Sequence, residues 1–83
     1  AIVRLNRAIA LCELTGPADA LNEVDSIEGL EDRHILHAVR GELLHRLGKH
    51  EEACKAFDRA LGLATSPAER ALLARKLKTS ERD

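Results

Sequence analysis

The sequence predicts an all-α protein, a stack of helical hairpins built from one repeated unit. Ala8, Gly41 and Ala74 are small residues spaced 33 positions apart, and a leucine stands three positions after each of them. Recurrence at a fixed interval of this length is typical of helical repeat arrays. Leucine and alanine dominate the composition, and Phe57 is the single aromatic residue among Phe, Trp and Tyr. The core is therefore expected to form from small residues packed against aliphatic ones.

Gly41 is the most informative position of this repeat. Glycine inside a helix costs about 1 kcal/mol relative to alanine, so we expect two helix backbones to approach closely there. Ala53 and Ala60 are expected to form the opposing surface on the next helix. The same offset of 33 positions relates four further pairs: Leu14 with Leu47, Ala20 with Ala53, Val24 with Phe57, and Ile27 with Ala60.

The first hairpin is predicted within residues 1–30, as a weaker copy of the repeat. Apolar residues recur with helical spacing over 2–15, and Gly16 followed by Pro17 ends this helix and begins another. Gly29 is expected to end the second helix. Its buried face is predicted to consist of Ala20, Leu21, Val24 and Ile27.

The second hairpin is predicted within residues 31–64. Asp32 is expected to cap its first helix, and Gly48 is expected to end that helix. The apolar stripe of this helix comprises Ile35, Leu36, Val39, Leu43 and Leu47. The next helix is predicted to run to about Ala64, burying Ala53, Phe57, Ala60, Leu61 and Ala64.

The last helix is predicted within residues 65–80 and completes a single domain spanning residues 1–83. Ser66 and Glu69 form a capping box around Pro67, which suits a first helical position. A capping helix covers the open end of a repeat array, and Leu72, Leu73 and Leu77 are expected to do so here. Fraying is predicted after Thr79.

Composition argues against direct nucleic-acid contact by this segment, because the formal charge is −1 and no aromatic platform is available for base stacking. A charged fraction of 33% and the lack of a long apolar segment predict a soluble, cytoplasmic protein. The chain begins at Ala1 rather than Met, and we interpret it as a piece of a longer protein.

Charge is unevenly distributed along the chain. Between Arg7 and Arg33 there are seven acidic residues and no lysine or arginine: Glu13, Asp19, Glu23, Asp25, Glu28, Glu31 and Asp32. A solvated acidic helix face is favoured as the explanation. An acidic patch that docks a basic partner surface is the alternative.

The sequence predicts neither an enzyme nor a cofactor or metal protein. No nucleophile, base and orienting group recur in a catalytic pattern, and no glycine-rich phosphate loop is present. His34 and His37 lie one helical turn apart, but a structural zinc site needs four converging ligands. Cys12 and Cys54 are too far apart for a close-spaced motif, and we expect reduced thiols on opposite surfaces of the stack.

The second hairpin resembles the tetratricopeptide repeat, at Gly41, Leu44, Leu47, Gly48, His50, Ala53, Phe57, Ala60 and Leu61. The resemblance implies a right-handed solenoid fragment of two hairpins plus a capping helix. It also implies that the first helix of each hairpin lines a concave protein-binding groove. The groove residues would be Leu5, Asn6, Ile9 and Glu13 from the first hairpin, and Ala38, Glu42, His45 and Arg46 from the second.

Asn6 would have one of two roles in such a groove. Its amide could bond a peptide backbone, or it could bond a neighbouring helix or water. The basic pairs that form a carboxylate clamp in some tetratricopeptide proteins are not evident, which argues against recognition of a peptide C-terminus.

A narrower resemblance covers nearly the whole chain. The runs 5–10, 16–18, 37–40, 46–48 and 68–70 are similar to the C-terminal extension of certain bacterial extracytoplasmic-function RNA polymerase sigma factors. The resemblance implies a protein-binding, regulatory domain whose partners are the sigma factor's own core domains in cis, or RNA polymerase. Promoter recognition and transcription initiation would belong to the parent protein. Leu72 and Leu73 depart from this family, which usually has an aromatic residue there.

Two other functions are alternatives to this one. A stand-alone scaffold could bind a peptide of an unrelated partner through the same groove, and a small-ligand sensor has little support in the residues. Self-association is also conceivable through an apolar N-terminal edge that includes Ile2 and Val3.

Overall fold

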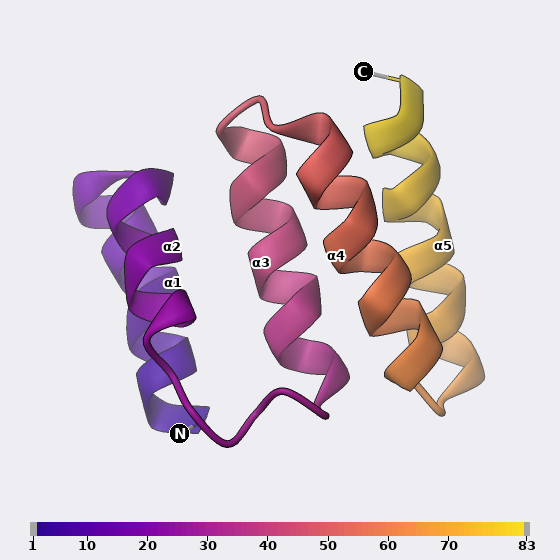
Figure 1. Cartoon of the computed structure of the whole chain (residues 1–83), viewed down its shortest axis with the longest axis horizontal. Coiled ribbons are helices and arrows are strands. Elements are labelled where there is room, and N and C mark those ends of the chain that lie inside the picture. Colours follow the sequence, from indigo (N-terminus) through magenta and orange to yellow (C-terminus); the bar gives the residue numbers. More distant parts are fainter. Residues whose placement is uncertain (1, 83) are drawn as a thin grey trace.

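Figure 1 shows the computed structural model, which describes residues 2–82 and the side chains of residues 3–80. Five helices follow one another as α1 (Ile2–Thr15), α2 (Pro17–Asp25), α3 (His34–Arg46), α4 (His50–Leu63) and α5 (Pro67–Arg82). No strand occurs within this part of the chain. The predicted all-α class with five helices is confirmed. Each helix contacts the next along the chain, and α3 lies in the middle of the row (Figure 1).

The turn between α3 and α4 follows directly from the Gly48 signal in the sequence. Gly48 has φ 78°, a backbone conformation that residues with a Cβ rarely adopt. The Gly48 N–H donates to the His45 carbonyl at 3.0 Å, and the Lys49 N–H donates to the Leu44 carbonyl at 2.9 Å. This pair of bonds is the Schellman arrangement, and it satisfies carbonyls that the end of α3 would otherwise leave unpaired.

Three predicted boundaries are wrong. α2 ends at Asp25 rather than continuing to Ile27, because the Ser26 hydroxyl bonds the Glu23 carbonyl at 2.7 Å in the last turn. Asp32 does not cap α3. Arg33 occupies the N-cap position in an extended conformation, without a side-chain capping bond.

The third error concerns the C-terminal helix. α5 continues to Arg82, and Ser80 is only 2% exposed. The predicted fraying after Thr79 is therefore wrong within the described residues. Burial of Ser80 against the stack explains why the helix continues.

The core consists of two clusters that share α3. The first is contributed by α1, α2, the following loop and α3, and it comprises Leu5, Ala8, Cys12, Ala20, Val24, Ile27, Leu30, Leu36 and Leu43. The second is contributed by α3, α4 and α5, and it comprises Leu44, Ala53, Ala56, Phe57, Ala60, Ala64 and Leu73. Half-buried Leu21 packs against both clusters and so joins them.

Gly41 faces the ring of Phe57. A Cβ added at position 41 would lie 2.7 Å from both Cδ1 and Cε1 of that ring. The close approach expected at Gly41 is present, but its partner is a buried aromatic side chain rather than a second backbone. Ala53 and Ala60 are fully buried on the same helix as Phe57. The small residue is required because the largest side chain of the core occupies the space next to it.

Candidate protein-binding groove

A groove runs across α1, α3 and α5. It encloses a hollow of about 270 Å³. Its lining residues are Ile9, Cys12, Glu13, Ile35, Ala38, Val39, Glu42, Leu43, Arg46, Leu72, Leu73 and Lys76. The hollow is just below the range of about 300–1,000 Å³ that small-molecule sites occupy. Its size therefore suits one or two anchoring side chains of a partner better than a cofactor.

Three large aliphatic side chains give the groove its apolar surface. Ile9 is 45% exposed, Ile35 is 38% exposed and Leu72 is 52% exposed, and each comes from a different helix. Single exposed aliphatic residues are common, but three that meet in one hollow form a contiguous patch. Helical geometry explains Ile35 well, because its neighbour Leu36 points into the core and a step of one residue rotates Ile35 away from it.

Polar contacts link side chains of the three lining helices. The Lys76 ammonium lies 3.2 Å from the Glu42 carboxylate, joining α5 to α3. The Arg46 guanidinium donates to Cys12 Sγ at 3.3 Å, joining α3 to α1. Glu13 has no hydrogen bond or ion pair with the other described residues. The rim therefore offers a carboxylate to a partner, beside a floor of aliphatic side chains.

A second hollow of about 270 Å³ adjoins the groove. Glu42, Leu72 and Lys76 line both hollows. At the far side, His45 Nδ1 lies 3.3 Å from both His50 Nδ1 and Ser80 Oγ. The two imidazole rings meet edge to face, with centroids 4.9 Å apart. These contacts fix His45 against α4 and α5, so it forms an end wall of the groove region.

Most of the residues expected in the groove lie there, with two exceptions. Ile9, Glu13, Ala38, Glu42 and Arg46 line the groove, and His45 lines the adjoining hollow.

Leu5 is 2% exposed and belongs to the first core cluster, so it offers no surface to a partner. Asn6 is exposed one helical turn before Ile9 but does not line either hollow. Its side chain bonds no other described residue, so the expected bond to a neighbouring helix is absent there.

Sequence reasoning missed Ile35 and Leu72 as groove residues. Ile35 was assigned to the buried stripe of its helix, and Leu72 was expected to cover the preceding hairpin together with Leu73 and Leu77. Leu73 is buried and Leu77 is half-buried, as expected, whereas Leu72 faces the groove. The signal was the pair Leu72–Leu73 itself, since consecutive helical residues point about 100° apart and two large side chains in a row seldom both reach the centre of one core.

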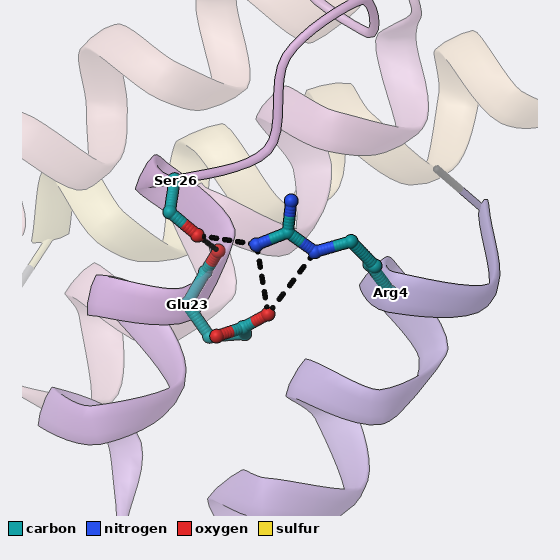
Figure 2. A network of polar contacts seen from close by, with 3 residues as sticks. All are labelled: Arg4, Glu23 and Ser26. Atoms are coloured by element: carbon teal, nitrogen blue, oxygen red, sulfur yellow. Dashed lines mark hydrogen bonds and ion pairs between the residues drawn. The ribbon is translucent and has the colours of Figure 1, made fainter.

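The acidic segment is partly neutralised by basic residues from outside it. Arg4 Nη2 lies 3.1 Å from the Glu23 carboxylate and 2.7 Å from the Ser26 hydroxyl, which clamps α1 to the end of α2 (Figure 2). Arg40 Nε donates to Asp25 at 2.7 Å and joins α3 to α2.

The Glu31 carboxylate accepts the Gly29 N–H at 3.0 Å. Three of the seven acidic residues therefore already have partners within the fold, so the segment is a weaker attractor of basic proteins than its sequence indicates.

The histidines do not converge on a metal site. His34 Nε2 lies 3.0 Å from the Glu69 carboxylate, and His37 Nε2 lies 2.7 Å from the Glu31 carbonyl. Among residues 3–80, no three His, Cys, Asp or Glu side chains form a group that could bind a metal ion. None of the helices in this part of the chain has the length and apolar character needed to cross a bilayer.

Comparison with known proteins finds a sequence relative of most of the chain. An uncharacterized protein of Rhizobium meliloti (strain 1021) is 43% identical over 77 residues, which are 92% of this chain and 18% of the relative. The chain thus spans less than a fifth of that protein, whose length is roughly 430 residues when 77 residues are taken as 18% of it. No family model and no solved structure matches the chain.

Proposed function

We propose that this chain is the protein-binding, regulatory C-terminal domain of a bacterial extracytoplasmic-function sigma factor. The groove that contains Ile9, Ile35 and Leu72 is the observation that carries the proposal, because it is an apolar surface suited to another protein. In this role the domain acts by contact in the cytoplasm, without catalysis or a cofactor. DNA contact falls to the promoter-reading domains of the parent protein.

The proposed architecture is two tetratricopeptide-like hairpins followed by a capping helix. Support comes from the burial of residues related by the offset of 33 positions. Ala20 and Ala53 are both 0% exposed, and Val24 and Phe57 are both 1% exposed. These two pairs of equivalent positions thus have matching burial, as repetition of one structural unit requires of its core. The narrower sigma-factor assignment rests on the sequence runs that resemble that family and on a relative several times longer than the matched segment.

The groove can act as a regulatory contact without binding tightly. Complete burial of an exposed Ile or Leu side chain contributes about 1.5–3 kcal/mol. Ile9, Ile35 and Leu72 are already about half-buried, so covering them would add about 1 kcal/mol each, or about 3 kcal/mol together. That corresponds to a change of about 150-fold in a docking equilibrium. A contact of this size, made within one polypeptide, is enough to shift the docked population and be reversed by a signal.

Deletion of this domain from the full-length parent tests the proposal. The level of promoter-specific transcription with core RNA polymerase, or its response to the inducing signal, is expected to change. A double variant, Ile9→Ser with Leu72→Ser, should reproduce the effect because it alters the groove. Both residues are about half-exposed, which limits the loss of stability. Lys55→Ala with Arg59→Ala, exposed on α4, is the matched control. Unchanged output and response for both the deletion and the groove variant would reject a regulatory role.

Asn6 and Glu13 provide a second test, because Glu13 lines the groove and Asn6 lies one helical turn before the groove residue Ile9. Both are exposed on α1 and bond no other described residue, so exchanging both for alanine should weaken the partner contact with little change in thermal stability. A large loss of stability would show instead that the two residues are structural.

A stand-alone scaffold is the alternative proposal and would use the same groove. The reading frame around this segment separates the two. Two helical promoter-reading regions would support the sigma factor, and further helical repeats would support the scaffold.

A further inference from the structure

We propose that the hollow of the groove binds a free α-amino acid with a large apolar side chain, such as leucine or phenylalanine. Arg46 would bind the carboxylate of this ligand, and Glu13 would bind its ammonium group. Its side chain would lie against the exposed aliphatic residues Ile9, Ile35 and Leu72. The inference goes beyond the protein contact proposed above and does not depend on it, because the 83-residue chain alone forms the site.

The hollow is built by the inner parts of the helices rather than by an end of the chain. Its lining residues on α1 lie within 9–13, in the second half of that helix, and those on α5 lie within 72–76, away from both ends of that helix. The others belong to α3, in the middle of the row. The N-terminal edge, where self-association is conceivable, takes no part: Val3 does not line the hollow, and the side chain of Ile2 lies outside the described residues.

Two opposite charges that line the hollow have no ionic partner within the described residues. Glu13 forms no hydrogen bond or ion pair there, and the Arg46 guanidinium donates only to Cys12 Sγ, at 3.3 Å. A thiol sulfur is a weak hydrogen-bond acceptor. The other two charged lining residues, Glu42 and Lys76, pair with each other at 3.2 Å. The site therefore matches a ligand that carries one positive and one negative charge.

Glu13 and Arg46 lie at the same end of the hollow. The helices α1 and α3 run in the same direction (Figure 1), and each of the two residues lies in the last turn of its helix. Cys12 precedes Glu13 along the chain and contacts Arg46. The two charged groups nevertheless form no ion pair with each other. An α-amino acid carries its ammonium group and its carboxylate on the same carbon atom, so one molecule can bridge the two side chains.

The rest of the hollow suits one apolar side chain. Its volume of about 270 Å³ is below the range of drug-sized ligands, as a molecule of about ten non-hydrogen atoms requires. Its walls include Ile9, Ile35 and Leu72. A charged ligand side chain would lose hydration against these walls without gaining a partner, because Glu42 and Lys76 already form an ion pair. Large apolar amino acids are therefore favoured over charged ones.

A bound amino acid would occupy the surface proposed to dock another protein, since both would use Ile9, Ile35 and Leu72. Occupancy would therefore oppose docking and make docking depend on the concentration of the amino acid. That consequence, unlike the binding itself, rests on the proposed function.

Titration of leucine into the ¹⁵N-labelled 83-residue chain, followed by NMR, tests the site. The amide shifts are expected to centre on the lining segments of α1 and α5, residues 9–13 and 72–76, and on residues 35–46 of α3. Serine should bind much more weakly, because its side chain buries little apolar surface.

Substitution of the two charges tests their roles. Glu13→Gln and Arg46→Gln should each weaken leucine binding about fivefold or more, between the effects of an exposed ion pair and of a hydrogen bond to a charged group. Both residues are exposed, so these substitutions leave the fold intact. Glu52→Gln and Arg59→Gln, which are exposed on α4, are the matched controls and should leave binding unchanged.

Two leucine derivatives separate a free amino acid from the end of a peptide. Leucinamide lacks the carboxylate, like the amino end of a peptide, and N-acetylleucine lacks the ammonium group, like the carboxyl end. Each should bind about fivefold or more weakly than leucine. Arg46→Gln should not weaken leucinamide binding further, and Glu13→Gln should not weaken N-acetylleucine binding further, because the charge that each residue recognises is already absent.

Three results would overturn the proposal: no shifts at about 10 mM leucine, shifts centred outside the hollow, or equal affinity for leucine and either derivative. Equal affinity would identify a peptide end as the ligand instead. The titration contains no protein partner, so its failure would leave groove docking standing. Failure of this site and failure of the proposed function are thereby distinguishable.

Discussion

Replacement of Gly41 by alanine tests the packing at the centre of the stack. The added Cβ would lie 2.7 Å from two ring carbons of Phe57 and 2.9 Å from a third. The ring is 1% exposed and has little room to move. Overpacking a tight core costs about 1–3 kcal/mol, whereas alanine in place of glycine gains about 1 kcal/mol of helix propensity. Three ring carbons closer than 3 Å place the steric cost in the upper part of that range, at about 2–3 kcal/mol. The steric cost then exceeds the gain, and we expect a net loss of about 1–2 kcal/mol.

Gly62 of α4 provides the matched control. It is also helical, but a Cβ there would have no neighbour within 4 Å. Gly62→Ala should therefore stabilise the protein, by about 0.5–1 kcal/mol. Thermal unfolding followed by far-UV circular dichroism measures both variants. For a domain of this size, 1 kcal/mol corresponds to about 4–8 °C in Tm, so Gly41→Ala should lower Tm by about 5–15 °C and Gly62→Ala should raise it.

A double-mutant cycle assigns the loss to the ring. In a Phe57→Leu background, Gly41→Ala should cost less than half of what it costs in the natural sequence, because the contacted ring carbons are gone. A stabilising Gly41→Ala, or a cost independent of residue 57, would refute the proposed contact.

Three further predictions follow from contacts between helices. Arg70 donates from Nη1 to the carbonyls of Leu61 and Ala64 at 2.8 and 3.2 Å. Arg70→Ala should therefore lower the free energy of unfolding by about 1 kcal/mol, because it removes these bonds at the end of α4. Equal urea midpoints for the variant and the natural sequence would contradict this. Arg4→Ala should lower the free energy of unfolding by at most about 1 kcal/mol, since Arg4 and Glu23 are both well exposed. This loss should be smaller in 1 M NaCl. A larger loss that salt leaves unchanged would show that the contact between Arg4 and Glu23 is not electrostatic. Truncation after Thr79 should lower Tm because Ser80 is buried, and an unchanged Tm would show that the end of α5 is not packed.

Local signals predict that the five helices exist and where two of them end. Gly16 and Pro17 separate α1 from α2, and Gly48 ends α3 with the predicted kind of cap. These signals act within a few residues of the chain, so the sequence contains all the information that they require. The offset of 33 positions likewise related Val24 to Phe57 correctly, and both are buried.

Contacts between distant residues were beyond sequence reasoning. The sequence predicts an exposed acidic face because the two cations that pair with it, Arg4 and Arg40, lie outside the segment and approach only when the helices pack. Helix periodicity also could not decide whether Leu72 or Leu73 faces the stack, because both lie near the boundary of the apolar stripe. Which side chains line the groove depends on which residue of such a pair faces the core. The sequence therefore predicts which helices form the groove better than it predicts the residues that line it.

Direct measurement of groove docking gives the most decisive test of the account. The 83-residue chain should be titrated against the promoter-reading region of the parent supplied as a separate polypeptide, with binding measured by calorimetry. The account predicts binding that weakens at least about tenfold in the Ile9→Ser, Leu72→Ser variant and is unchanged in Leu14→Ser, which replaces an exposed α1 residue outside the groove. Absence of binding, or binding that the groove variant leaves unchanged, would contradict it.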